Sequence, residues 1–303
     1  MNKRGMFFTL MVIAILSLFL ITYTSYYVIK DRSPIKKRVE TLNNFVFSIE
    51  NDLPRQLYIS GFRIIFILEK KIIDNGEYID DLNASFQELF FEGSIDVSTE
   101  VLMRGANFTG IQEFIGEKAN KINAKTELSN PVFFVTQDDP WHVKLSLTFD
   151  LFVADNTNLS FWNKTSTVVS YIPIENFEDP VYTIGSGGVL TNKISKTIYE
   201  PFVSGDDVSN LTSHVNPDNS YYIASARAPS FLDRLQGINA PNENGIESLV
   251  YVPELSSPHT KSVVDFIYFS DNNPAINMIS GMPGWFRLDN ESLGIYGVED
   301  LAG

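Results

Sequence analysis

The chain has 303 residues and a formal net charge of −14, with 44% hydrophobic residues and no cysteine. The lack of cysteine excludes a disulfide framework, thiolate zinc sites and cysteine nucleophiles, while the hydrophobic content excludes a disordered chain. The charge is unevenly divided: residues 1–38 carry seven Lys and Arg and one Asp, which leaves 16 basic and 36 acidic residues in 39–303. A region this acidic repels nucleic acid, so we expect no nucleic-acid partner.

Residues 6–29 contain no charged side chain, and 6–21 are almost wholly apolar. As a helix this stretch would extend about 36 Å, enough to cross a hydrocarbon core of about 30 Å. Tyrosines near its end are typical of a membrane–water interface. We therefore predict a transmembrane helix over 6–29. The alternative is a cleaved secretory signal, but the apolar run is longer than the core of such signals and no small-residue cleavage site follows it.

Basic residues flank the span on both sides: Lys3 and Arg4 precede it, and five more follow between 30 and 38. Counted alone, they favour a cytoplasmic location for the C-terminal part. The size and acidity of that part, its alternating strands and its N-x-[ST] sequons favour the outside. We expect a single-pass protein of the cell membrane whose C-terminal domain is extracellular.

The first residues also carry a motif. Lys3-Arg4-Gly5 followed by Met6-Phe-Phe-Thr-Leu10 resembles the class III (prepilin-type) signals of archaeal type IV pilin-like proteins, over roughly the first 30 residues. The resemblance implies a cytoplasmic leader over 1–5, cleavage between Gly5 and Met6, and other pilin-like or membrane-anchored subunits as partners. Major bacterial pilins carry a glutamate at the fifth mature position, where this chain has Leu10, which favours a minor subunit. The alternative is an ordinary signal anchor in which Lys-Arg-Gly is coincidental.

Residues 30–75 predict a helical stalk. Ser33-Pro34 is typical of a helix start, and apolar residues then recur every three or four positions from Ile35 to Leu57. Pro54 predicts either a kink or the start of a second helix. The segment 57–73 is very apolar but carries Arg63, so we expect a helix buried against the globular part that ends at Asn75-Gly76.

The remaining residues, 76–303, predict one extracellular α+β domain. Over 76–127 the pattern is helical, with helices near 84–91 and 109–126. Over 130–175 it changes to period two, most clearly at 143–153, and predicts an antiparallel β-meander with one buried face. Over 176–303 it is mixed, with short helices at 193–199 and 228–235, strands at 246–252 and 263–269, and a last strand at 285–288. The fold expected is α+β: a transmembrane helix continuing into a helical stalk packed on a β-meander ectodomain.

Catalytic, cofactor and metal sites are not predicted. The three histidines, His142, His214 and His259, share no ligand spacing, and Ser186 in GSGG is not a nucleophile elbow. The loop 205–210 is the least unfavourable calcium candidate but lacks the spaced oxygen ligands of such a site. Six sequons make glycosylation candidates of Asn83, Asn107, Asn158, Asn163, Asn210 and Asn290.

Charged residues around the predicted helix 228–235 have two interpretations. Arg227, Asp233 and Arg234 either form an ion-pair network that fixes the helix or present a candidate interaction surface to a neighbouring subunit. For the whole chain we expect a pilin-like surface subunit that acts through assembly or adhesion and not through catalysis. The alternative is a signal-anchored ligand-binding or hydrolase ectodomain whose site is assembled from dispersed residues, with perturbed carboxylates in a concave pocket.

Overall fold

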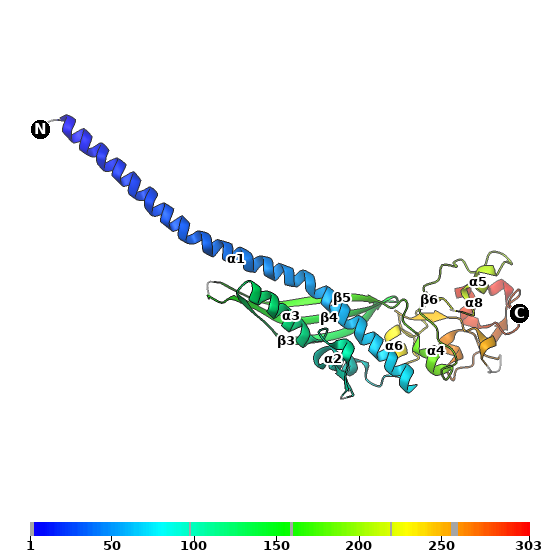
Figure 1. Ribbon diagram of the computed structural model, residues 1–303. Helices are drawn as coiled ribbons and strands as arrows, with labels where there is room; N and C mark the ends of the chain where they lie inside the picture. Colours follow the sequence, from blue (N-terminus) through cyan, green and yellow to red (C-terminus); the bar gives the residue numbers. More distant parts are fainter. Residues whose placement is uncertain (1–2, 97, 158–159, 219, 256–259) are drawn as a thin grey trace. The chain divides into compact units, whose positions relative to one another are not determined.

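The computed structural model describes residues 3–96, 98–157, 160–218, 220–255 and 260–303, and their side chains except those of 3–6 and 27–34. It combines helices with antiparallel sheets, as expected for an α+β chain (Figure 1). The chain forms two compact units: the first contains α1 up to Asp52 together with 112–130 and 149–166, and the second contains 53–111, 131–148 and 167–303.

Helix α1 (Lys3–Asn75) is a single element of 73 residues. The helix starts expected at Ser33-Pro34 and at Pro54 are therefore wrong, because α1 runs through both prolines. A proline removes one backbone hydrogen bond, but the buried side chains of Leu53 and Leu57 hold the helix on either side of Pro54. The end at Asn75 is confirmed: Gly76 adopts φ 69°, and its N–H donates to the Ile72 carbonyl at 2.8 Å.

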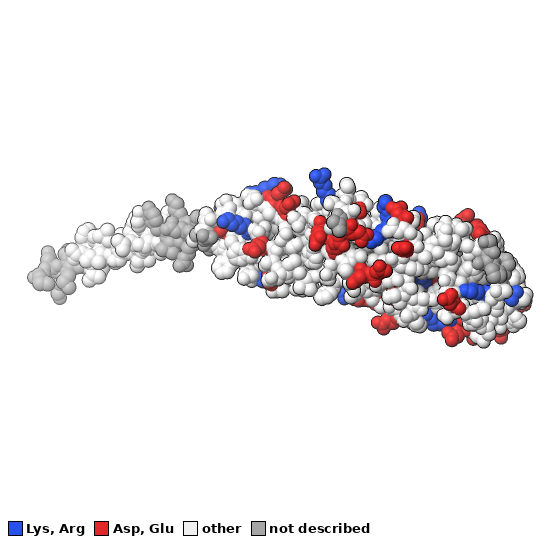
Figure 2. All heavy atoms as spheres, turned by 90° about the horizontal axis from the view of Figure 1, so that it is seen from below, with Lys and Arg blue, Asp and Glu red and all other residues white. Residues whose placement is uncertain are grey.

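The first part of α1 is long and apolar enough to cross a membrane. Within the described residues it contains one candidate span, Phe7–Tyr26, with a mean hydropathy of 2.3 and no buried residue. Figure 2 shows this stretch without acidic or basic side chains. The hydroxyls of Thr22 and Thr24 donate to the carbonyls of Leu18 and Leu20 at 2.9 Å, so these polar groups are satisfied within the helix itself.

The first unit is built on α1 and is fastened by ion pairs. The predicted apolar seam becomes buried from Leu42 onward, whereas its first two residues, Ile35 and Val39, are 44% and 38% exposed. Arg38 bonds Asp155, which is only 1% exposed, and also donates to the Asn123 carbonyl at 2.6 Å. Two further pairs join helix to helix and helix to strand, Asp52–Lys118 and Glu50–Lys164.

The predicted β-meander is present as a three-stranded sheet in the order β3-β4-β5. Its strands are β3 (Ala124–Asp139), β4 (His142–Asp155) and β5 (Phe161–Pro173). The alternation predicted for β4 is confirmed, because Val143, Leu145, Leu147, Phe149, Leu151 and Val153 are all at most 1% exposed. The helix expected up to Thr126 is too long. Helix α3 (Phe108–Lys121) ends earlier, and β3 begins at Ala124 after Asn123 turns the chain at φ 57°.

The second unit packs α1 beyond Leu53 against one face of this sheet. At Gly61 the helix approaches so closely that an added Cβ would overlap the ends of Leu145 and Ile172. The helix expected near 84–91 is present as α2 (Leu82–Glu92), which is capped by Asp81 and ends at Gly93. It places Phe90 against Phe133 of β3, with ring centroids 4.2 Å apart. Short elements β1 (Ser94–Ile95), β2 (Ser98–Thr99) and η1 (Val101–Met103) follow it.

The rest of the second unit consists of short elements. Two antiparallel pairs, β6 (Tyr222–Ala224) with β7 (Ile246–Ser248) and β8 (Ile276–Met278) with β9 (Arg287–Asp289), lie among short helices. The helices are α4 (Pro180–Gly185), α5 (Ser209–His214), α6 (Phe231–Leu235), η2 (Val252–Glu254), α7 (Asp265–Tyr268), α8 (Asn290–Tyr296) and η3 (Glu299–Leu301).

Two sequence predictions are wrong in this region. The helix expected at 193–199 does not form, because its backbone bonds distant segments: Ile194 N–H donates to Phe177 and Thr197 N–H to Tyr222, at 2.9 Å each. The strand expected at 263–269 is extended only at its start, where Val263 N–H donates to Arg287 at 2.8 Å. From Asp265 the chain turns into α7, because Tyr268 N–H bonds back to the Val264 carbonyl.

Candidate functional site

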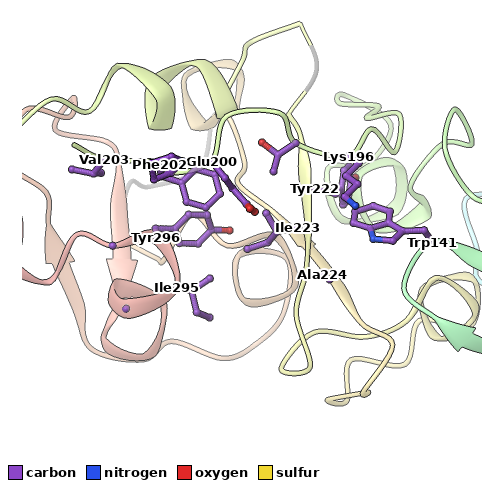
Figure 3. A pocket seen from close by; sticks show the side chains of 14 residues that line it. Trp141, Lys196, Glu200, Phe202, Val203, Tyr222, Ile223, Ala224, Ile295 and Tyr296 are labelled. Carbon is purple, nitrogen blue, oxygen red and sulfur yellow. The ribbon is translucent and has the colours of Figure 1, made fainter.

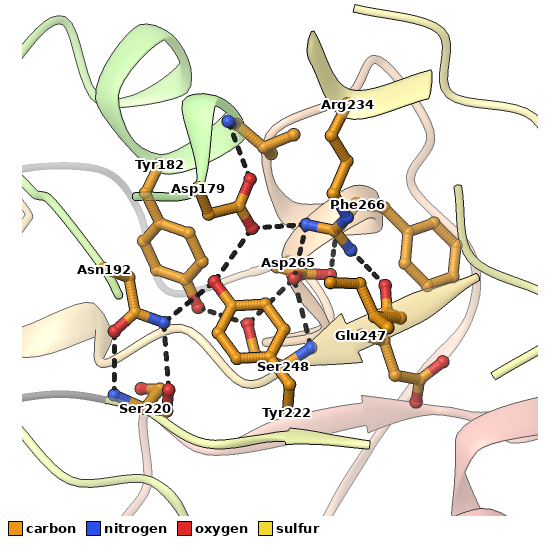
Figure 4. A network of polar contacts seen from close by, with 12 residues as sticks. Asp179, Tyr182, Asn192, Ser220, Tyr222, Arg234, Glu247, Ser248, Asp265 and Phe266 are labelled. Carbon is orange, nitrogen blue, oxygen red and sulfur yellow. Dashed lines mark hydrogen bonds and ion pairs between the residues drawn. The ribbon is translucent and has the colours of Figure 1, made fainter. Parts of the chain in front are cut away.

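A buried arginine lies at the centre of the second unit. Helix α6 begins with a capping box in which Ser230 and Asp233 bond each other's backbone N–H groups. This start fixes Arg234, which is 0% exposed. Its Nη1 donates to Asp179 Oδ2 at 2.5 Å and to Asp265 Oδ2 at 3.0 Å, and its Nη2 donates to the Ile246 carbonyl (Figure 4). One guanidinium thus ties together α4, α6, β7 and α7.

The two carboxylates that face Arg234 are themselves fully engaged. Asp179 is the N-cap of α4, accepting from Val181 N–H at 3.0 Å, and it accepts the Tyr222 hydroxyl at 2.8 Å. Asp265 accepts the Ser248 hydroxyl at 2.8 Å and its N–H at 3.1 Å. Each carboxylate therefore joins the guanidinium to the backbone of another element, as a buried charge requires.

The electrostatics of this cluster favour a structural role. Burial disfavours the guanidinium charge, but Asp179 and Asp265 outweigh it and raise the pKa of Arg234. Burial raises the pKa of Asp179, opposed chiefly by Arg234. All three side chains are 0% exposed, so the cluster is closed to any substrate. It holds the unit together and does not form a reaction centre.

A second buried carboxyl group, Glu69 on α1, has no cation paired with it among the described residues, and the backbone N–H of Glu178 is the one hydrogen-bond donor that lowers its pKa. Glu69 is 7% exposed, and its Oε1 finds no hydrogen-bond donor in the part of the chain that the structure describes. Burial, reinforced by the negative charges of Glu178 and Asp179, raises the pKa of Glu69 to about 9. At neutral pH the group is therefore protonated, which is unusual for glutamate and marks a functional-site candidate.

Glu69 lines a pocket of about 360 Å³, called here the Glu69 pocket. One wall comes from α1, with the half-exposed side chains of Phe62, Phe66 and Ile73. The segment after β5 supplies the rest of the apolar lining, where Phe177 lies against Phe62 with ring centroids 5.2 Å apart. The rim is charged and consists of Lys70, Glu175, Glu178 and Lys193.

Two larger hollows are more open. One, of about 740 Å³, lies between Trp141, Lys196, Glu200, Tyr222 and Tyr296, with Lys196 Nζ 5.4 Å from the centre of the Trp141 ring (Figure 3). The other, of about 630 Å³, is lined by asparagines and by the Arg227–Asp289 pair. The polar groups of Arg227 are already engaged with protein partners, so this hollow offers less to a ligand than the Glu69 pocket does.

The residues expected as a candidate interaction surface do not lie together on a surface. Arg234 is wholly buried, so its assignment to such a surface is wrong. Asp233 caps α6. Arg227 bonds Asp289 at 3.1 Å, Glu291 at 3.2 Å and the Ser292 hydroxyl at 3.1 Å. The other interpretation, an ion-pair network that fixes the helix, describes Arg234 correctly, whereas Asp233 contributes through the helix cap and not through an ion pair.

The glycosylation candidates differ in accessibility. Asn83, Asn163, Asn210 and Asn290 are exposed, as an acceptor must be. Asn107 is half-buried, and its Oδ1 accepts the Gly110 N–H at 3.0 Å. Asn158 lies outside the described residues, and at the expected processing site between Gly5 and Met6 only the backbone is described.

The histidines and acidic pairs have local roles. His142 bonds Asp139 at 3.0 Å, whereas His214 is buried, bonds Thr197 at 3.0 Å and has its pKa lowered by burial to about 4. His259 lies outside the described residues. In the loop 205–210, Asp207 accepts the Ser209 N–H at 2.9 Å. Among the residues that the structure describes, no group of three His, Cys, Asp or Glu side chains is placed to hold a metal ion.

Sequence reasoning missed Glu69, Asp179 and Asp265. Asp179-Pro180 is a typical N-cap followed by proline, so the start of α4 could have been found from the sequence. Its pairing with Arg234, 55 residues away, has no sequence signal. For Glu69 the sequence did contain a weak signal, because Glu69 is the only carboxylate within the apolar stretch 57–73. Comparison with protein-family models, with curated proteins and with solved structures finds no match.

Proposed function

We propose that this chain is a pilin-like, single-pass membrane subunit that acts through assembly with other membrane-anchored subunits and not through catalysis. The observation that carries the proposal is helix α1. Its first part is a bare apolar span, Phe7–Tyr26, and its last part is buried in the globular region as far as Ile72. One continuous helix thus supplies both a membrane anchor and a buried core helix. This arrangement is what we expect of a subunit that assembles through its N-terminal helix.

The same proposal assigns a role to the N-terminus. Cleavage between Gly5 and Met6 would leave an apolar helix that begins directly at the membrane surface. With Leu10 where major bacterial pilins have glutamate, the helix would hold its neighbours by side-chain packing, as membrane helices generally do. The exposed asparagines at 83, 163, 210 and 290 support an extracellular C-terminal domain, where they would be available to a glycosylation system.

Disulfide cross-linking tests this proposal, because the chain has no cysteine of its own and each introduced cysteine is therefore unique. Four single-cysteine variants, at Ile13, Ala14, Ile15 and Leu16, sample every side of the helix, because each residue advances the helix by roughly 100°. If α1 packs against α1 of another subunit, oxidation of membranes should give a disulfide-linked dimer for one or two of the four. A fifth variant, Glu113→Cys at an exposed position in α3, is the control for random collision.

Two results would overturn the proposal. One is cross-linking at none of the four positions, or at the same level as at 113. The other concerns processing: peptide mapping of membrane-extracted protein should find a mature chain that begins at Met6, and Gly5→Phe should block it. An intact Met1 or Asn2, unchanged by Gly5→Phe, would leave an ordinary signal anchor.

A further inference from the structure

We propose that the Glu69 pocket binds a small organic cation, a primary ammonium group carried on an apolar body. The pocket lies outside the candidate membrane span Phe7–Tyr26, and this inference does not depend on whether the chain assembles with other subunits. It rests on three features of the described residues: the shape and lining of the pocket, an unpartnered polar atom, and the balance of charge around it.

The lining suits an apolar body. Phe62, Phe66 and Ile73 stand on one face of α1 and are 45%, 47% and 46% exposed, which is unusual for large apolar side chains that lie beside one another. Together with Phe177 they line a volume of about 360 Å³, within the usual range of small-molecule sites. An aromatic or branched aliphatic group would bury these side chains.

The polar requirement comes from Glu69. Its Oε1 is buried and has no donor among the described residues, whereas buried polar atoms in proteins nearly always have one. Glu69 forms part of the pocket lining but its Oε1 is covered, so a turn of this side chain toward the pocket would bring Oε1 to a ligand N–H group that supplies the missing hydrogen-bond partner. An ammonium group offers three such donors and a charge that complements a carboxylate.

The surrounding charges favour a cation over an anion. Glu178 and Asp179 both raise the pKa of Glu69 through their negative charge, against a backbone hydrogen bond from Glu178 that lowers it, so these two carboxylates would attract a cation and repel an anion. Two cations also lie at the rim. Lys70 is bound to Asp74 and is 66% exposed, and Lys193 is exposed. The exposed carboxylate of Glu175 also belongs to the rim and offsets the positive charge of Lys193.

Binding should therefore release a proton. In the empty pocket burial holds the pKa of Glu69 at about 9, so the carboxyl group is neutral at pH 7. A bound ammonium group favours the carboxylate and lowers this pKa. Because the ligand selects the ionised form, its affinity should rise about tenfold for each pH unit between pH 6 and pH 8.

The experiment is isothermal titration of the full-length protein in detergent micelles at pH 6, 7 and 8. The probe is phenethylamine, and two analogues with the same ring, 2-phenylethanol and phenylacetate, replace the ammonium by a neutral and by an anionic group. We expect phenethylamine to bind at least tenfold more tightly than either analogue at pH 8, with an affinity that falls as the pH is lowered.

Two variants locate the site. Glu69→Gln preserves the size and neutral hydrogen bonding of the protonated side chain, so the fold should be kept while the affinity for phenethylamine at pH 8 falls at least tenfold and its pH dependence disappears. Glu77→Gln makes the same change at an exposed carboxylate just beyond α1 and should leave the affinity unchanged. Equal binding to wild type and Glu69→Gln, equal binding of the alcohol, equal loss in Glu77→Gln, or no binding by any probe would overturn the proposal.

Discussion

Arg234 joins several parts of the second unit, because four separate elements bond to its guanidinium or to the carboxylates beside it. A buried ion pair is not in itself a source of large net stability, since desolvation of the charges offsets much of their attraction. Its importance appears when one partner is removed. The remaining carboxylates would then be buried without their cation, and they are too deep in the unit to reach water.

Replacement of Arg234 by methionine should accordingly be severe. We expect Arg234→Met to lower the free energy of unfolding by about 3–5 kcal/mol, the usual result of breaking a buried pair. Arg104→Met, at an exposed arginine, should change it by less than about 0.5 kcal/mol. Chemical denaturation of the two variants and of wild type measures the difference. Similar stability of Arg234→Met and Arg104→Met would contradict the role assigned to the buried cluster.

Residue-level chemistry was the least predictable part of this chain. The sequence indicated that Arg227, Asp233 and Arg234 formed a group, but it could not separate the wholly buried Arg234 from the half-exposed Arg227. Burial is decided by which distant elements fold over a position, and Asp179 and Asp265 reach Arg234 from 55 and 31 residues away. The Glu69 pocket escaped for the same reason, because Phe177 and Glu178 come from beyond the sheet.

Among the elements, α1 and β4 show what a regular pattern can establish. Alternation over 143–153 predicted both the strand and its buried face, since side chains of a strand point alternately to opposite sides. The seam along α1 likewise predicted the buried residues from Leu42 onward. The errors at 193–199 and 263–269 lie in segments of only seven residues, where neither the helical nor the strand period is long enough to be distinctive and bonds to distant segments decide the backbone.

The contact between α1 and the sheet gives an element-scale prediction. At Gly61 any side chain would overlap the ends of Leu145 and Ile172, so Gly61→Val should overpack this contact and lower the free energy of unfolding by about 1–3 kcal/mol. Gly116, in α3, has no atom within 4 Å of its Cβ position, so Gly116→Val should change stability by less than about 0.5 kcal/mol. Thermal denaturation followed by circular dichroism compares the two. Equal effects would mean that α1 does not press on the sheet at Gly61.

For the molecule as a whole, the general fold class followed from the sequence more readily than its division into units. Composition and periodicity gave an apolar N-terminal helix, a helical region and an antiparallel meander, and these are present. The compact units each draw on segments far apart in the chain. Such a division depends on which helix packs on which part of a strand, and a local pattern carries no information about it.

The buried ionisable groups link the stability of the molecule to pH in a direction that can be worked out. Glu69 has a pKa of about 9 in the folded chain and an ordinary value of 4.5, so between these values the folded state holds the extra proton, and stability is lost as the pH rises. His214 has a folded pKa of about 4 against an ordinary 6.5, so between these values the unfolded state holds the extra proton, and stability is lost as the pH falls. The two effects oppose each other between 4.5 and 6.5.

Above pH 6.5 His214 is neutral in both the folded and the unfolded state, so of these two groups only Glu69 still makes stability depend on pH. We expect the free energy of unfolding of the full-length protein in detergent to fall between pH 7 and pH 9, by at most about 1.4 kcal/mol per pH unit for this single proton. Glu69→Gln cannot ionise and should show a much flatter profile, with any residual slope due to Glu247 and Asp179, whose pKa values burial also raises. Denaturant titrations at pH 6, 7, 8 and 9 provide the comparison. Parallel profiles for the two proteins would mean that Glu69 is already ionised at neutral pH. In that case cation binding would release no proton from Glu69.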